Sequence, residues 1–344
     1  MYPFIRSALF LLDPEVVHGL TLRLIRLAGQ LPPIRWLLTA WFSPPEKPVD
    51  VFGIHFKNPV GLAAGYDKDG LGWRGLACLG FGHIEIGTVT LKPQAGNPKP
   101  RLFRLVNEKA LINRMGFPGK GARFAVSQLE GKRPPGLVLG VNIGKNKDTP
   151  LENAAEDYLA LQDIFYPLAD YLAVNVSSPN TLGLRRLQAR DQLEALLTKM
   201  ELKRIQKNSE GYPKTPILVK LAPDLERTEL EDALAAITSS GMDGIIVSNT
   251  TISRDGLDIG SEEHPTVARQ TGGLSGAPLS QRSTEMIRLV YQMTAGKLPI
   301  MGVGGVMDAQ GAREKLDAGA SLVQIYTGLV YAGPGLVKQI VGSL

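Results

Sequence analysis

The chain has 344 residues, of which 44% are hydrophobic and 21% charged, a globular composition that can bury a large core. Its net charge of +5 includes no Lys/Arg run dense enough for a nucleic-acid tail, so we expect no nucleic-acid partner. A single cysteine, Cys78, excludes an intrachain disulfide, and the four histidines lack the spacing of metal ligands, so we expect no metal site.

Residues 1–47 are expected to form amphipathic helices ahead of the main domain. Apolar residues recur at helical spacing before Asp13, which is followed by proline, as at a helix start. In the next helix Arg23 and Arg26 lie outside an apolar stripe, and Trp36 and Trp41 follow two prolines. Such helices suit either a membrane surface or packing on the main domain, and both hold if they form a hood that touches lipid and lines a tunnel. No segment is apolar over the roughly 18 residues that a membrane span needs.

From residue 59 onward, short apolar runs alternate with amphipathic helical stretches. Near-continuous apolar runs are typical of strands buried on both faces, as in a parallel sheet. The eight runs are 60–63, 83–87, 137–141, 171–175, 217–221, 244–247, 300–303 and 322–325. Eight such units predict a closed (β/α)8 TIM barrel over residues 48–344, with an open doubly wound sheet as the alternative.

Polar residues gather at the predicted strand ends, where barrel enzymes place their chemistry. Five asparagines are expected to face one mouth: Asn113 from an added loop, and Asn142, Asn175, Asn180 and Asn249. Buried amides need hydrogen-bond partners, and each amide offers a donor and an acceptor. This set therefore suits a planar ring that bears amides, carbonyls or a carboxylate.

Glycines follow the seventh and eighth runs, where barrels commonly bind phosphate. Gly304 and Gly305 follow the seventh run, and Tyr326, Thr327 and Gly328 follow the eighth. Backbone N–H groups at such glycines can approach phosphate oxygens, although each glycine could instead make a tight turn. Residues 272–276, rich in glycine, are expected to form a flexible flap nearby.

Two lysines are the expected cations of the mouth. Lys220 lies within a strand, so it faces inward and can either form a Schiff base or stabilise negative charge on a reduced cofactor. Lys68 can hold a phosphate or a substrate. With no histidine at a strand end, Ser178 and Lys220 remain as candidate bases; a serine is a weak base, and Ser178 could equally form a turn.

Taken together, these residues resemble the class 2, quinone-dependent dihydroorotate dehydrogenase family of the bacterial type. The resemblance runs from end to end and is carried by the segments 61–68, 85–90, 99–104, 113–117, 141–147, 175–183, 220–224, 249–251, 271–276, 302–305 and 324–327. Serine at 178, where the related soluble class carries cysteine, and the N-terminal helices are the two marks of the quinone class. One departure is Tyr66, where the family commonly has leucine or phenylalanine.

The resemblance implies bound FMN, with Ser178 as catalytic base and Lys220 beside the cofactor. The implied FMN contacts are Ala64, Gly65, Tyr66, Asp67, Lys68, Thr88, Asn142, Asn175, Lys220, Ser248, Gly276, Gly305, Tyr326 and Thr327. The implied substrate contacts are Lys68, Asn113, Arg114, Met115, Gly116, Phe117, Asn175, Asn180, Asn249 and Thr250. His18, Arg104 and Tyr326 match positions of a quinone tunnel.

The activity implied is oxidation of dihydroorotate to orotate in pyrimidine biosynthesis, with a membrane ubiquinone or menaquinone as acceptor. The family also implies a monomer held peripherally at the cytoplasmic face of the bacterial inner membrane. Three alternatives remain: a lyase or aldolase that uses Lys220 as a Schiff base, a membrane scaffold without chemistry, and a soluble flavin dehydrogenase that uses fumarate or NAD. Absence of bound flavin would favour either of the first two, and electron-acceptor assays would identify the third.

Overall fold

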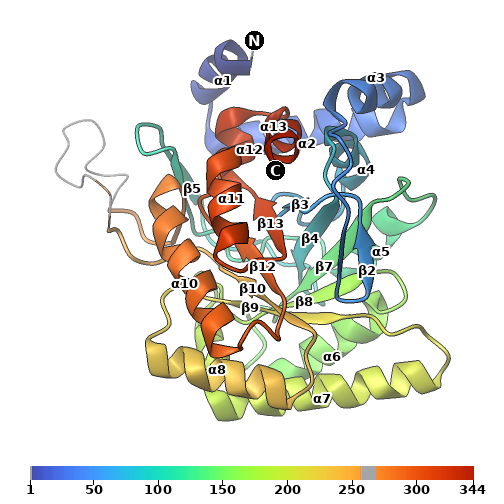
Figure 1. Ribbon diagram of the computed structural model, residues 1–344, viewed down its shortest axis with the longest axis vertical. Helices are drawn as coiled ribbons and strands as arrows, with labels where there is room; N and C mark the ends of the chain where they lie inside the picture. The colour runs from blue at the N-terminus through green and yellow to red at the C-terminus, as the bar shows by residue number, and fades with distance from the viewer. Residues whose placement is uncertain (1, 256, 258–268) are drawn as a thin grey trace.

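The computed structural model describes residues 2–255, 257 and 269–344. Within this part of the chain, eight parallel strands close into a barrel (Figure 1). In order they are β3 (Val60–Leu62), β4 (His83–Val89), β7 (Val138–Ile143), β8 (Tyr171–Asn175), β9 (Ile217–Leu221), β10 (Gly244–Val247), β12 (Ile300–Val303) and β13 (Leu322–Ile325). The last strand pairs with the first, Val323 opposite Val60, so the barrel is confirmed and an open sheet is excluded.

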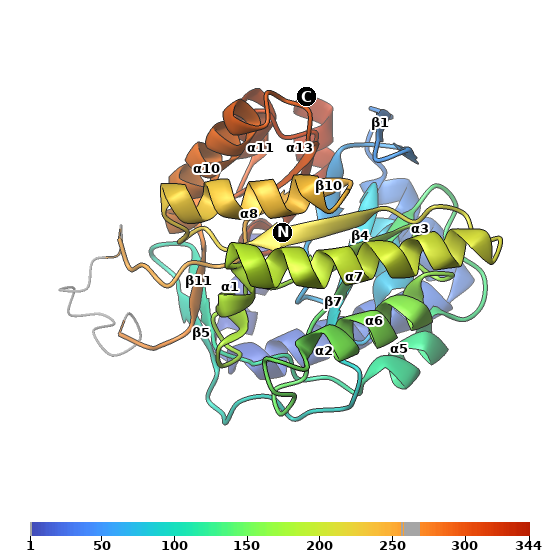
Figure 2. The same ribbon diagram turned by 90° about the horizontal axis from the view of Figure 1, so that it is seen from below.

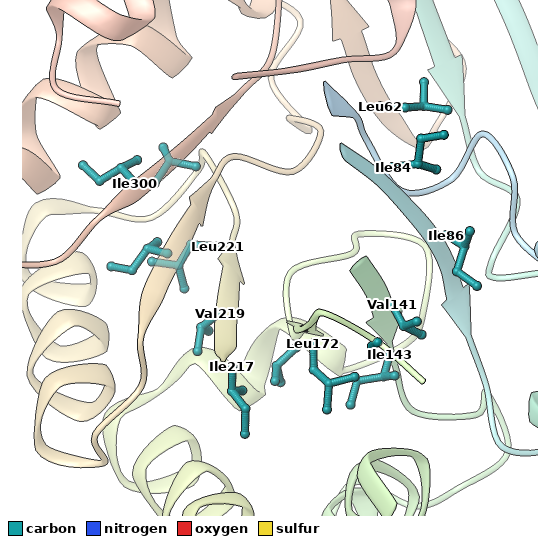
Figure 3. Close-up of a cluster of buried hydrophobic side chains, with 14 of the residues drawn as sticks. Leu62, Ile84, Ile86, Val141, Ile143, Leu172, Ile217, Val219, Leu221 and Ile300 are labelled. Carbon is teal, nitrogen blue, oxygen red and sulfur yellow. The ribbon is translucent and has the colours of Figure 1, made fainter. Parts of the chain in front are cut away.

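Helices surround the barrel, and the hydrophobic core lies between them and the strands. The helices that follow the barrel strands are α4 (Trp73–Leu76), α5 (Ala122–Leu129), α6 (Ala154–Phe165), α7 (Arg190–Ser209), α8 (Arg227–Ser239), α10 (Ser280–Met293), α11 (Ala309–Asp317), α12 (Thr327–Ala332) and α13 (Leu336–Ser343). Side chains such as Leu62, Ile84 and Val219 extend from the outer face of the strands into this layer (Figure 3). Because the inner face is also filled, for example by Phe56 and Leu218, most residues of the strands are apolar.

A hairpin closes the barrel end from which the strands start. It consists of β1 (Val49–Val51) and β2 (Ile54–Phe56), and Phe56 is fully buried inside the barrel. Phe52 at its tip packs against Gly244, where an added Cβ would lie 2.3 Å from the phenyl ring. The opposite end, where the strands finish, is therefore left for the site.

A three-stranded antiparallel sheet lies at the open mouth. Its strands are β5 (Leu102–Leu105), β6 (Ala110–Asn113) and β11 (Gly273–Gly276). The prediction of a flexible flap over 272–276 was wrong, because residues 273–276 pair along their length with β6. The glycines permit close packing: a Cβ on Gly276 would lie 2.3 Å from the carbonyl oxygen of Lys109. Asn113, expected in a loop, is the last residue of β6.

The N-terminal segment forms three helices, α1 (Tyr2–Phe10), α2 (Pro14–Gln30) and α3 (Pro32–Phe42), which lie at one end of the molecule (Figure 1). The predicted cap is confirmed, since Asp13 Oδ1 accepts hydrogen bonds from the N–H groups of Glu15 and Val16 at 2.9 and 3.0 Å. The α1 helix is attached to α12: Tyr2 donates to the Val330 carbonyl at 2.6 Å, and Arg6 donates to that of Tyr331 at 2.8 Å.

Packing of the N-terminal helices on the main domain is confirmed, and contact with a membrane stays a prediction. One side packs on the barrel, where Gly29 of α2 meets Gly75 of α4 so closely that a Cβ on Gly29 would lie 2.5 Å from the Gly75 nitrogen. The other side leaves large apolar residues exposed, including Leu20, Leu24, Leu27, Leu31, Ile34, Trp36, Leu37 and Trp41. Among the described residues, no helix has the length and hydropathy needed to cross a membrane. We refer to α1–α3 below as the hood.

Figure 2 shows the molecule from below, with α6, α7 and α8 along the barrel wall. These helices are among the amphipathic stretches expected between the strands, and the 3-10 helices η1 (Ala77–Leu79), η2 (Leu184–Gln188) and η3 (Ala277–Leu279) lie in other connections. Cys78 lies in η1 and is buried.

Candidate active site

A cavity of about 1030 Å³, including its open mouth, lies at the end of the barrel where the strands finish. This volume is at the upper end of the range for a ligand of cofactor size. The predicted site residues that line it are Ala64, Gly65, Lys68, Thr88, Asn113, Met115, Gly116, Phe117, Asn175, Ser178, Asn180, Lys220, Ser248, Asn249, Thr250, Gly276, Gly305, Tyr326 and Thr327. Segments from every part of the barrel therefore converge on one space, which we call the first cavity.

Four of the residues expected to contact FMN or the substrate do not line the first cavity. Asp67 is fully buried beside it, where its carboxylate accepts hydrogen bonds from the N–H groups of Leu71 and Gly72 at 2.7 and 2.8 Å. Burial raises the pKa of Asp67 to about 6 despite these bonds. Arg114 turns outward and donates to the carbonyl of Pro100 at 2.9 Å. Asn142 and Tyr66 also lie outside the lining of this cavity.

Asn142 lies under the cavity floor, within a chain of hydrogen bonds that links strand ends. Thr88 Oγ1 donates to Asn142 Oδ1 at 2.5 Å, and Asn175 Nδ2 donates to Thr88 Oγ1 at 2.8 Å. Asn249 Nδ2 in turn donates to Asn175 Oδ1 at 3.2 Å. These bonds join the ends of β4, β7, β8 and β10, so the amides that reach the cavity are held in fixed orientations.

A buried carboxylate, Glu85, lies inside the barrel below this chain. It accepts hydrogen bonds from Asn142 at 2.9 Å, Gln324 at 3.0 Å and Tyr171 at 3.1 Å. Sequence reasoning did not single out Glu85. The signal was present, however, because an acidic residue in the middle of a predicted buried strand must face the interior. A carboxylate held in this way provides a fixed negative charge beneath the cavity.

Lys220 presents its ammonium group to the cavity above that charge. Its Nζ lies 3.8 Å from Glu85 Oε1, and its side chain is 6% exposed. Burial lowers the pKa of Lys220, and the neighbouring carboxylate acts in the opposite direction. The inward orientation expected for Lys220 is confirmed, with Glu85 as its counter-ion.

One end of the cavity is built from glycines and hydroxyl groups. Gly305 has a φ of 71°, and a Cβ there would lie 2.3 Å from Ser280 Cα, so no larger residue fits. Thr327, the first residue of α12, lies beside it and shares a hydrogen bond of 2.9 Å with Ser275. Backbone N–H groups at a glycine turn, hydroxyl groups and a helix start suit a phosphate group.

Ser178 lies in the loop after β8 and is 4% exposed on the cavity wall. Its Oγ accepts a hydrogen bond from the backbone N–H of Asn180 at 3.2 Å. Lys68 also lines the cavity, and its Nζ donates to the Gly65 carbonyl at 2.6 Å. Burial lowers the pKa of Lys68 to about 8. The wall thus combines the Ser178 hydroxyl, which accepts one hydrogen bond, with the Lys68 amine, which is mostly protonated at neutral pH.

A second cavity of about 590 Å³, again including its opening, lies between α1, α2 and the barrel mouth. It brings together His18, Arg104 and Tyr326, the residues predicted for a tunnel, and Tyr66 also lines it. Leu102, Leu111 and Tyr326 line both cavities, so the two are adjacent. Burial lowers the pKa of His18 to about 3, with Lys68 contributing in the same direction, and His18 is therefore neutral at neutral pH.

Comparisons with known proteins agree on one family. The family model for dihydroorotate dehydrogenase matches residues 48–344. A protein named dihydroorotate dehydrogenase (quinone) from Anaeromyxobacter sp. is 50% identical over 342 residues, 99% of this chain and 91% of that protein. One of the same name from Yersinia enterocolitica is 48% identical over 341 residues, 99% and 98% of the two chains.

Solved structures show the same likeness. The ligand-free enzyme from Eimeria tenella superposes with a TM-score of 0.84 at 38% identity, covering 96% of this chain and 93% of that one. The complex of the Eimeria tenella enzyme with ferulenol superposes with a TM-score of 0.83 at 37% identity, covering 96% and 90%.

Proposed function

The chain belongs to the dihydroorotate dehydrogenase family, and from this premise we propose that it oxidises dihydroorotate in the first cavity and delivers the electrons to a membrane quinone in the second. It is a quinone-type enzyme with FMN as its cofactor, and its reaction serves pyrimidine biosynthesis. The observation that carries the proposal is the pair of adjoining cavities: one is lined by amides and lysines, and the other, under the hood, is lined mainly by apolar side chains.

The residues of the first cavity fit FMN. Gly276, Gly305 and Thr327 would hold the phosphate, since they line the same end of the first cavity and the two glycines allow close approach to the backbone. Thr88, Asn175 and Lys220 would surround the ring system, since their polar groups face the cavity near the barrel axis. When bound, FMN takes up a hydride from the substrate and later gives two electrons to the quinone.

The chain's own groups would bind and orient dihydroorotate on the mouth side. The amides of Asn113, Asn180 and Asn249 offer donors and acceptors to the ring amides and carbonyls. The ammonium group of Lys68 would pair with the carboxylate, a charge-assisted contact. These hydrogen-bond and charge partners on both sides of the ring hold its two reacting carbons in position. The entropic cost of reaching the transition state is therefore lower.

Ser178 would remove the proton from one of those carbons. The hydrogen bond that its Oγ accepts from the Asn180 N–H would stabilise negative charge on the oxygen as its own proton passes to water at the open mouth of the cavity. This donor makes the alkoxide easier to form, and the alkoxide rather than the neutral hydroxyl would act as the base.

The hood would supply the route for the quinone. Residues 1–47 form this extension and residues 48–344 the catalytic barrel in our proposal, with His18, Arg104 and Tyr326 around the quinone head group. The exposed apolar side of α2 and α3 would rest on the bilayer, so that a monomer sits peripherally at the cytoplasmic face of the bacterial inner membrane.

An anaerobic titration of the purified protein with dihydroorotate tests both half-reactions. We expect the flavin absorption to bleach and to return on addition of ubiquinone or menaquinone, but not of NAD or fumarate. A yellow protein that does not bleach would remove dihydroorotate as substrate. A colourless protein that takes up no FMN would favour a lyase in which Lys220 acts as a Schiff base. Recovery of the colour with NAD or fumarate would remove the quinone.

A further inference from the structure

Tyr66 follows the first barrel strand but faces the second cavity rather than the first. Its ring meets that of His18 edge-on, with centroids 5.1 Å apart, and that of Tyr326 with centroids 5.8 Å apart. Because Tyr326 lines both cavities, Tyr66 lies at the inner end of the second cavity, where an electron acceptor comes nearest to the first.

The hydroxyl of Tyr66 lies near the side chain of Thr21, which also lines the second cavity. Thr21 Oγ1 donates to the carbonyls of Val17 and His18 at 2.9 and 3.0 Å, so its proton is engaged within α2. Burial raises the pKa of Tyr66 to about 12, and the phenol therefore keeps its proton at neutral pH. Rotation about the C–O bond can redirect this O–H without moving the ring.

Several side-chain donors on the wall of the second cavity are already engaged, since Tyr2, Thr21 and Arg104 each donate to a backbone carbonyl. Most of its lining is apolar, with Leu9, Phe10, Pro14, Val17, Leu329 and Val330 among the side chains. A quinone head group carries two carbonyl oxygens, and burying either one without a donor is costly. Arg104 lies over the ring of Phe10, 4.5 Å from its centroid, near the start of the hood. At the inner end, Tyr66 provides a neutral donor.

We propose that Tyr66 is a binding residue for the electron acceptor, and that its hydroxyl turns from Thr21 to donate a hydrogen bond to a carbonyl oxygen of the quinone. The inference rests on the proposed function, which places the quinone in the second cavity. Tyr66 thereby fixes the end of the head group next to Tyr326, and so sets how closely the acceptor approaches the cofactor.

Tyr66→Phe tests the contact, because it removes the hydroxyl and keeps the ring. The measurement is the Kd of a short-tailed benzoquinone for the oxidised holoenzyme, by titration calorimetry, together with the KM for the same quinone. We expect both constants to rise about 3- to 10-fold, the usual effect of losing one neutral hydrogen bond. FMN content and the rate of flavin reduction by dihydroorotate report whether the first cavity is intact. An unchanged Kd would overturn the proposal.

Thr21→Val is the matched control. It removes the hydroxyl next to Tyr66 and leaves that of Tyr66 for the quinone, so we expect the Kd to stay level or fall. If the hydroxyl served only to attach α2 to the barrel, Thr21→Val and Tyr66→Phe would raise the Kd alike, and that result would also overturn the proposal.

A third variant separates this inference from the proposed function. Val17→Trp adds a large side chain to the wall of the second cavity and should block the head group. Unchanged quinone binding in this variant would place the quinone elsewhere and remove the proposed second site. Loss of binding in Val17→Trp, with normal binding in Tyr66→Phe, would remove the role of Tyr66 alone.

Discussion

The ammonium nitrogen of Lys220 lies 3.8 Å from a carboxylate oxygen of Glu85 inside the barrel, and both side chains are buried. Removing one partner of such a pair leaves an uncompensated buried charge. We expect Lys220→Met to lower the free energy of unfolding of the apoprotein by about 3 kcal/mol, as measured by urea denaturation.

The double variant Glu85→Gln, Lys220→Met is the control for this pair. It removes both charges, and we expect it to recover much of the stability that Lys220→Met loses. A double variant as unstable as the single one would show that Lys220 does not compensate the charge of Glu85.

Ser178→Ala should slow the reduction of bound flavin by dihydroorotate by at least about 100-fold, because a positioned base contributes roughly that much or more. The rate is measured by anaerobic stopped-flow absorption, and FMN content should stay normal because Ser178 lies on the substrate side. Ser178→Cys should retain more activity than Ser178→Ala, since a thiol can still accept the proton. Equal rates in the two variants would argue for packing rather than for base catalysis.

His83 makes the stability of the protein depend on pH. Its ring is fully buried with both nitrogens unpartnered, and burial lowers its pKa from 6.5 to about 3. A lowered pKa means that His83 contributes stability above pH 6.5, and that this contribution is lost as the pH falls towards 3. Between pH 7 and pH 5 the loss from His83 is about 2 kcal/mol, and His18 adds a change of the same sign.

His83→Phe tests this assignment, because it keeps an aromatic ring and removes both buried nitrogens. We expect the variant to be at least as stable as the parent at pH 7, and to lose about 2 kcal/mol less between pH 7 and pH 5 by urea denaturation. A loss equal to that of the parent would place the acid sensitivity elsewhere.

Trp36→Glu combined with Trp41→Glu should weaken binding to phospholipid vesicles at least about tenfold. The two side chains, 73% and 66% exposed on α3, would otherwise enter the interface. Co-sedimentation with anionic vesicles measures the effect. Leu202→Glu is the matched control: this leucine is 62% exposed on α7, at the opposite end of the molecule (Figure 1), and its replacement should leave vesicle binding unchanged. Equal losses in both proteins would argue against a lipid-binding hood.

Much of the barrel could be predicted from the sequence, because strands buried on both faces are mostly apolar. Strand ends were equally informative: the amides of Asn175 and Asn249 reach the same cavity because parallel strands finish at one end of the barrel. The burial of Glu85 was missed because one acidic residue inside an apolar run does not disclose its partners, which come from β7, β8 and β13.

Loops were harder to predict, because side chains in a turn follow no fixed alternation. Tyr66 and Asp67 adjoin residues that line the first cavity, yet one faces the hood and the other caps backbone N–H groups. Similarly, glycines at 272–276 suggested flexibility, whereas in β11 they allow two backbones to approach closely. Composition alone does not distinguish these two uses of glycine.

The attachment of α1 to α12 has a consequence for synthesis of the chain. Arg6 and its partner Tyr331 are 325 residues apart, so α1 leaves the ribosome well before the segment on which it docks. At common elongation rates this interval is about 15 to 65 s. During that time α1 lacks its docking site on α12. A chaperone, or the bilayer in our proposal, can therefore cover its apolar residues before the barrel has closed.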